Sequence, residues 1–171
     1  MPDIRARWNV AFKRQAQSDK HVYERLCTTP LPVCHRLHYL QMFLEKLCKA
    51  HLWMQHDVGQ GEPDWLRSHA VIAKALPLII RDYMRGQGAA DVSQYRIREF
   101  RELCREIELL APAVRDAGNR LDNCEYPWAT IDNHGQPVVR APRDWDFRIE
   151  SRLRGPAGRE MLKVALAIAE Q

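Results

Sequence analysis

The residues best suited to chemistry gather between positions 120 and 128. The charged and aromatic members of this stretch are Arg120, Asp122, Glu125, Tyr126 and Trp128. Its two carboxylates could form a general acid–base pair, and its arginine could clamp a phosphate or a carboxylate. Its two aromatic rings could stack on a base or fill a pocket on a partner. The structural alternative is that Asp122 and Asn123 cap a turn after the fourth predicted helix, while Tyr126 and Trp128 pin the chain that follows onto the helices.

Two further cations follow this stretch within a short distance along the chain. Arg140 and Arg143 stand close to Asp144 and Trp145. An arginine presents its N–H donors in a fixed fork, which suits the oxyanions of a ligand or a partner. We therefore expect a binding surface made by residues 120–128 together with Arg140 and Arg143.

Metal and cofactor sites find little support in the sequence. Cys34 and His38 are four residues apart and would share one face of a helix, a spacing that can grip a metal ion. A third ligand from His51 would lie several turns further along the same rigid helix, so no metal site is expected. The chain also lacks a phosphate-binding glycine loop, a serine nucleophile elbow and a dinucleotide fingerprint. No cofactor is expected.

Helices must position these residues, because apolar side chains recur every three or four positions over most of the chain. The pattern predicts about five helices, which are 3–26, 33–55, 64–84, one from Asp91 to a stop at Gly118-Asn119, and a last one that begins at Gly155-Pro156. Pro77 should kink the third helix or divide it in two. In the fourth helix, Asp91 and Gln94 resemble a capping box, and alternating arginines and glutamates predict a solvent-facing side.

Each predicted helix has one apolar stripe. The first carries Ile4, Trp8 and Phe12, and the second carries Leu40 and Leu44. Helices of this kind bury their stripes against one another, and the short connections favour antiparallel neighbours. The sequence therefore predicts an all-α, antiparallel up-and-down helical bundle that forms a single domain over residues 1–171.

Residues 120–146 form an insertion of different character before the last helix. They contain three prolines and the turn-like run Asp132-Asn133-His134-Gly135. Short apolar runs at 128–131 and 138–140 stand on either side of that turn. We predict a short β-hairpin or a compact Ω-like loop here. A loop of this length in a small helical protein is uncommon unless it has a function.

Composition narrows the class of protein further. The 171 residues are 46% hydrophobic, and 26 Lys and Arg against 22 Asp and Glu give a net charge of +4. This balance permits a nucleic-acid partner without arguing for one. No apolar run approaches the roughly 18 residues of a membrane helix. The five cysteines are an odd set without a CxxC pair, which is typical of reduced thiols in a cytoplasmic protein.

A family resemblance rests on Trp8, Asp19 and the segment from Cys34 to Leu52. This segment contains a His, Gln41, Glu45-Lys46 and Lys49-Ala50 in the order and spacing found on the second helix of HEPN domains, which it resembles. The resemblance implies a helical bundle that pairs as a homodimer, as is common in toxin–antitoxin and defence systems. It also implies RNA or a partner protein, such as a nucleotidyltransferase-like antitoxin, as the bound molecule.

Many HEPN proteins are metal-independent ribonucleases with an Arg-x(4–6)-His motif near a late helix. In that motif the histidine moves protons and the arginine holds the phosphate. Here His134 has no arginine at that spacing, whereas Arg14 and His21 have the spacing but lie on the first helix. The ribonuclease activity is therefore not carried over from the family.

Three functional hypotheses remain open. The first is a non-catalytic, dimeric binding or regulatory module of a toxin–antitoxin or defence system. The alternative is a divergent metal-independent ribonuclease acting on RNA, with its site at Arg14 and His21 or in the cluster from Arg120 to Glu125. A third is a structural subunit whose aromatic insertion docks onto another chain.

Overall fold

The computed structural model describes residues 4–57, 61–88, 92–114 and 123–171. Within these ranges the chain is mostly helical, with one two-stranded sheet. The elements are the α-helices α1 (Ile4–Cys27), α2 (Val33–Gln55), α3 (Ile72–Gly86), α4 (Gln94–Glu108), α5 (Arg148–Leu153) and α6 (Pro156–Ile168), the 3-10 helices η2 (Asp64–Leu66) and η3 (Pro142–Asp144), and the strands β1 (Trp128–Ile131) and β2 (Pro137–Arg140).

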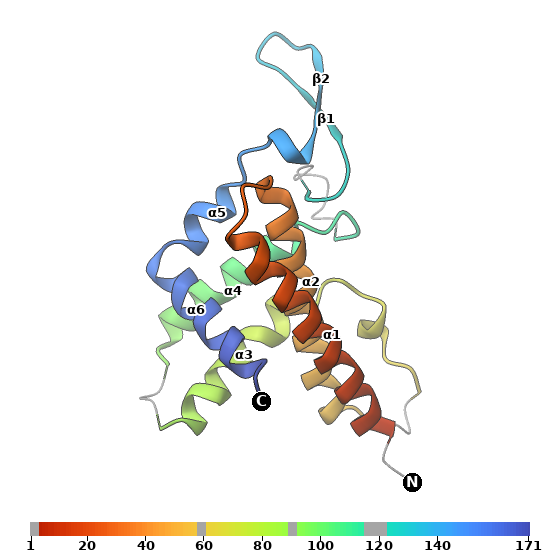
Figure 1. The fold of residues 1–171 in the computed structure, drawn as a ribbon, viewed down its shortest axis with the longest axis vertical. Coiled ribbons are helices and arrows are strands. Elements are labelled where there is room, and N and C mark those ends of the chain that lie inside the picture. Colours follow the sequence, from red (N-terminus) through yellow and green to blue (C-terminus); the bar gives the residue numbers. More distant parts are fainter. Residues whose placement is uncertain (1–3, 58–60, 89–91, 115–122) are drawn as a thin grey trace.

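The predicted all-α bundle with a hairpin insertion is confirmed. Helix α1 packs along α2, α3 packs on α4, and α6 lies against both α3 and α4. Strands β1 and β2 pair antiparallel, and their hairpin projects away from the helices (Figure 1). In the described part of the chain, no helix is long and apolar enough to cross a lipid bilayer.

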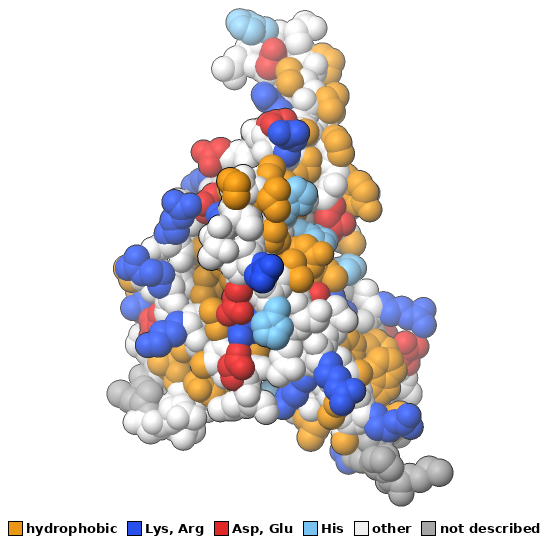
Figure 2. Space-filling model, in the orientation of Figure 1, with side chains coloured by type: hydrophobic (Ala, Val, Ile, Leu, Met, Phe, Trp, Pro, Cys, Tyr) orange, Lys and Arg blue, Asp and Glu red, His pale blue; other side chains and the backbone are white. Residues whose placement is uncertain are grey.

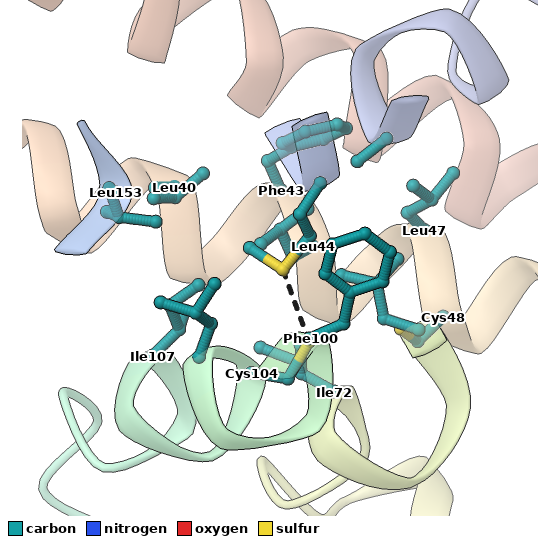
Figure 3. Close-up of a cluster of buried hydrophobic side chains, with 14 of the residues drawn as sticks. Leu40, Phe43, Leu44, Leu47, Cys48, Ile72, Phe100, Cys104, Ile107 and Leu153 are labelled. Atoms are coloured by element: carbon teal, nitrogen blue, oxygen red, sulfur yellow. Dashed lines mark hydrogen bonds between the residues drawn. The ribbon is translucent and has the colours of Figure 1, made fainter. Parts of the chain in front are cut away.

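The hydrophobic core lies where α2 meets α3, α4 and α6. Figure 3 shows this cluster, in which Leu44 and Phe43 of α2 lie above Phe100 and Cys104 of α4. The Cys104 thiol donates to the Met161 sulfur of α6, with 3.7 Å between the two sulfur atoms. The predicted apolar stripe of the second helix is thus buried, because α2 is surrounded by neighbouring helices.

Helix α1 differs from the predicted pattern. Its side chains Ile4 and Trp8 are exposed, whereas its buried residues are Ala16, Asp19 and Lys20. Ile4 and Trp8 are exposed because α1 lies at the edge of the bundle and packs mainly on α2. The apolar stripe of the first helix is therefore only partly covered by the described chain.

The third predicted helix is divided, but not at its proline. The segment from Asp64 to Met84 contains the short helix η2, then an irregular stretch, and then α3 from Ile72. Pro77 lies inside α3 and is buried. The break instead falls at residues 67–71, so His69 stands outside any helix.

The fourth helix is shorter than predicted. Its N-cap is Ser93, whose hydroxyl oxygen accepts a hydrogen bond from the Arg96 amide, and it ends at Glu108. Pro112 explains the early end, because proline lacks an amide hydrogen and disfavours helical backbone at the residue before it. The predicted cap Asp91 and the predicted stop at Gly118-Asn119 lie outside the described residues.

The end of the chain also differs, since α5 precedes the predicted last helix. Gly158 at the start of α6 lies directly against the backbone of α5. A Cβ at this position would stand 2.5 Å from the Leu153 Cα atom, so only glycine lets the two helices approach this closely.

Candidate functional site

A group of polar side chains is buried where α1, α2 and the segment before α3 meet. Helix α2 supplies Gln41, Glu45 and Lys49, which share one face because they are four residues apart. Helix α1 supplies Asp19, and His69 reaches the group from the irregular stretch after η2. We call these five residues the polar site. Charged residues are seldom buried in so small a domain unless they are paired or have a function.

Glu45 is the centre of the polar site, since its fully buried carboxylate has a donor on every side. One oxygen accepts from the Lys49 ammonium at 2.7 Å. The other accepts from the Gln41 amide at 2.9 Å and from Nδ1 of His69 at 2.8 Å. Burial by itself raises the pKa of Glu45, but Lys49, Lys46 and His69 outweigh it and hold the pKa below 4.5. The carboxylate is therefore ionised at neutral pH.

The bond from Glu45 fixes the protonation pattern of the His69 ring. An ionised carboxylate can only accept hydrogen bonds, so Nδ1 of His69 must carry the proton. The other ring nitrogen, Nε2, is then available to a second partner. The side chain of His69 is 40% exposed, so that partner can come from solvent. A histidine oriented by a buried carboxylate in this way can act as a general acid or base.

Asp19 is the least satisfied member of the polar site. One carboxylate oxygen accepts from the Gln15 amide at 3.0 Å, and the other is buried without a hydrogen-bond partner. Burial raises the pKa of Asp19 above its usual 3.8, against the opposing effects of Gln15 and Lys46. Two carboxyl groups of one cluster are thus shifted in opposite directions.

Sequence reasoning named part of this site as a family motif but gave it no role in binding or catalysis. Glu45, Lys46 and Lys49 stand in the motif that carries the HEPN resemblance, and Asp19 supports it. Another residue of that resemblance, Trp8, stacks on Trp53 with ring centroids 5.2 Å apart. His69 was missed, because the predicted helix would have placed it on an apolar stripe. Only the i, i+4 spacing of the three polar residues on α2 could have indicated a polar face.

The predicted binding surface is described only in part, because Arg120 and Asp122 lie outside the described residues. The structural alternative holds for its neighbour Asn123, whose side-chain oxygen accepts from the amides of Glu125 and Tyr126 at 2.9 and 2.7 Å. The Glu125 carboxylate lies 3.5 Å from Nδ1 of His38 on α2. Tyr126 is exposed. The turn is therefore capped, while one of the two predicted aromatic rings stays accessible.

The inner face of the hairpin anchors it to the chain that follows. Trp128 is buried and meets Trp145 edge to face, with ring centroids 5.4 Å apart. Arg140 pairs with Trp128 across the two strands. Its guanidinium carbon lies over the Trp145 ring, 5.9 Å from the ring centroid. Arg143, in η3, is exposed and lies 3.4 Å from Asp144. Trp128 and Arg140 are thus engaged within the fold, and Arg143 is accessible.

The outer face of the hairpin is apolar and uncovered. Its members are Ala129, Ile131, Pro137 and Val139, which form two facing pairs in the register of the strands. All four are exposed, with Ile131 at 67% and Val139 at 74%. Figure 2 shows hydrophobic side chains along one side of this projection. We call these four residues the apolar hairpin face.

The other sequence candidates belong neither to the polar site nor to the apolar hairpin face. Arg14 and His21 are exposed on α1, and His21 borders a shallow hollow with Thr28 and Thr29. Cys34 is buried, whereas His38 faces Glu125. Within the described ranges, no group of three or more His, Cys, Asp or Glu is placed to hold a metal ion. All five cysteines are free thiols, and four of them are buried.

Comparison with known proteins adds no further assignment. No family model matches the chain, and no curated protein or solved structure matches it.

Proposed function

We propose that the chain is a HEPN-like, non-catalytic binding module that docks onto a partner protein through the apolar hairpin face. One observation carries the proposal: Ala129, Ile131, Pro137 and Val139 all lie on the uncovered side of a hairpin that projects from the bundle. Contiguous apolar surface on a projecting element is typical of a protein interaction site.

The energetics favour an occupant for this face. Burying apolar surface stabilises a contact by about 25 cal/mol per Å². A two-stranded hairpin has little stability of its own, so a partner that covers its open face also stabilises the hairpin. In the described chain, β1 and β2 pair only with each other, which leaves their outer edges open to an added strand. The partner we propose presents an extended, apolar segment.

The resemblance to HEPN domains supplies the biological setting of the proposal. It places the module in a cytoplasmic toxin–antitoxin or defence system, with a nucleotidyltransferase-like antitoxin as the partner. It also implies a homodimer. Light scattering on the purified chain should then give twice the monomer mass of 20.0 kDa.

The docking proposal is tested by adding charge to the apolar hairpin face. The variant Ile131→Asp/Val139→Asp puts two carboxylates there, and burying them against an apolar partner is costly. Tagged chains are expressed at native level in the source cells, and co-purified proteins are quantified by mass spectrometry. We expect one partner chain in near-equal amount with the wild type, reduced at least tenfold with the variant.

A matched control adds the same charge elsewhere on the hairpin. Asn133→Asp/Gln136→Glu changes two exposed positions at the turn and leaves the apolar hairpin face intact. The control should recover the partner as the wild type does. Recovery of no stoichiometric partner, or equal recovery by both variants, would contradict the proposal.

A second candidate function is metal-independent RNA cleavage at the polar site. The supporting observation is the 2.8 Å bond between His69 and Glu45, which orients a half-exposed ring as an acid–base catalyst requires. The ammonium groups of Lys46 and Lys49 both lie within 4 Å of the same carboxylate, at 3.7 and 2.7 Å.

RNA incubated with purified protein in EDTA distinguishes the two functions. His69→Asn keeps a donor for Glu45 but removes the imidazole ring, and His21→Asn is the matched control on α1. Intact RNA with the wild type is the result expected of a non-catalytic module. Cleavage lost only in His69→Asn would favour the polar site, and cleavage lost only in His21→Asn would favour Arg14 and His21.

A further inference from the structure

A second surface, away from the hairpin and the polar site, collects positive charge. It is a groove of about 820 Å³ between the start of α3 and the outer side of α4. Its cationic side chains are Lys74, Arg98, Arg101 and Arg105. The three arginines are three and four residues apart, so they line one side of α4 and face the groove together. The sequence pattern had indicated only a solvated helix face here.

Both carboxylates of the groove already have partners, one of which is the groove's own Arg98. The buried Glu108 accepts a hydrogen bond from the Ala73 amide at the start of α3, at 2.8 Å. Glu102 lies 3.2 Å from Arg98 and 3.8 Å from Arg152. By contrast, neither Lys74 nor Arg101 forms an ion pair with any described residue. The groove therefore has cationic capacity that the fold itself does not use.

The rest of the lining limits the kind of anion that fits. The remaining walls are Ala70, Ala73, Leu109 and Val114, and the described lining contains no aromatic ring. Bases could not stack there, so recognition must act through charge on a backbone. The four cationic side chains are exposed along the groove between the two helices, where the phosphates of a flexible single strand can reach them.

We propose that this groove binds single-stranded nucleic acid through its phosphates, without reading the bases. The arginines extend over about 10 Å of α4 at 1.5 Å per residue, which is long enough to contact more than one phosphate. Arg101 can fork onto a phosphate, and Lys74 adds a point charge from the opposite wall. The groove acts independently of the apolar hairpin face.

The test is fluorescence anisotropy with end-labelled oligo(U) and oligo(dT) in buffers of 50 to about 200 mM salt, the range in which phosphate contacts weaken steeply. Lys74→Gln/Arg101→Gln should weaken binding of both oligonucleotides at least tenfold at the lowest salt. Losing two phosphate contacts should also make the slope of log affinity against log salt shallower by about 1.4. Each single variant should weaken oligonucleotide binding less than the double variant does.

Two controls distinguish an effect of the groove on binding from an effect of net charge and from an effect of the hairpin. Arg159→Gln/Lys163→Gln removes the same charge from exposed positions on α6 and should change affinity less than twofold. Ile131→Asp/Val139→Asp should bind like the wild type, so failure of the docking proposal and of this one are distinguishable. The proposal is overturned if neither oligonucleotide binds, if the α6 control loses as much as the groove variant, or if anionic vesicles bind with the same dependence on Lys74 and Arg101.

Discussion

Nδ1 of His69 lies 2.8 Å from a carboxylate oxygen of Glu45, although the two residues belong to segments of different character. His69 stands in irregular chain and is half exposed, whereas Glu45 is fully buried on α2. The bond fastens the segment before α3 to α2 and leaves one ring nitrogen toward solvent. It is therefore both a structural tie and the best-oriented proton donor or acceptor of the polar site.

The pairing of Glu45 with Lys49 should be essential to stability. Glu45→Gln removes the negative charge and leaves the buried Lys49 ammonium without a counter-charge. Breaking a buried ion pair in this way costs about 3–5 kcal/mol of the free energy of unfolding. Urea denaturation monitored by circular dichroism measures the loss.

The double variant Glu45→Gln/Lys49→Met is the control for that prediction. It removes both charges, so it should be more stable than Glu45→Gln alone. The coupling energy from the double-mutant cycle should fall within about 0.5–3 kcal/mol. A double variant that is less stable than either single variant would show that the two side chains stabilise the fold separately.

Asp19 should make the wild type less stable as the pH rises. Because burial raises its pKa in the folded state, the folded chain binds more protons than the unfolded chain at pH values just above 3.8. The contribution of Asp19 to the free energy of unfolding therefore falls through that window and stays lower above it. Asp19→Asn lacks this titration, so it should be more stable than the wild type at pH 7, with the advantage vanishing toward pH 3.

The matched control for Asp19 is Asp146→Asn, which changes an exposed aspartate. Exposed substitutions usually change the free energy of unfolding by no more than about 0.5 kcal/mol. Thermal melts of all three chains across the pH range provide the comparison. If Asp19→Asn were less stable than the wild type at pH 7, the ionised carboxylate would have to be better paired than its one hydrogen bond indicates.

Leu44 should be one of the largest single contributors to the core. It is fully buried, and Figure 3 shows it close to Phe100 and Cys104 of α4. Leu44→Ala leaves a cavity and should cost about 2–5 kcal/mol. Leu31→Ala, at an exposed position, should change stability by no more than about 0.5 kcal/mol. Equal effects of the two substitutions would mean that α2 is rotated about its axis.

Gly158 should tolerate no side chain. A Cβ there would lie 2.5 Å from both the Leu153 Cα atom and the Leu153 carbonyl oxygen, so α5 and α6 would have to separate. We expect Gly158→Ala to lower the free energy of unfolding by at least about 1–3 kcal/mol.

Gly86 provides the contrasting case for the same substitution. It lies at the end of α3, where a Cβ would have no neighbouring atom within 4 Å. Alanine has the higher helix propensity, so Gly86→Ala should raise stability by up to about 1 kcal/mol. Chemical denaturation of the two variants side by side checks both signs. A stable Gly158→Ala chain would mean that the contact between α5 and α6 is loose.

The sequence predicted the bounds of an element correctly where those bounds depend on residues within that element alone. Helix α2 begins after Pro30 and Pro32 and ends at Gln55, as predicted, because prolines and a glycine-rich run bound its apolar pattern. The hairpin strands also fall where the apolar runs on either side of the Asp132–Gly135 turn predicted them. The end of α4 was misplaced because its periodicity continues past Pro112, while the backbone cannot.

Burial of charge could not be read from the chain in the same way. Glu45 and Lys49 look like the exposed pairs of any amphipathic helix, because their spacing is the same in both cases. Their burial depends on α1 and the segment before α3, which cover that face of α2. Likewise, strand alternation cannot tell which face of a hairpin stays open until the position of Trp145 is known.

The amino-acid order alone determined the helical class, the position of α2 and the existence of the hairpin, because these follow from backbone preferences and spacing within each segment. The fold alone decided that His69 meets Glu45, that Trp145 covers only one side of the hairpin, and that Lys74 stands across a groove from Arg101. Such relationships join residues from different elements, and their energies arise only when packing brings those elements together.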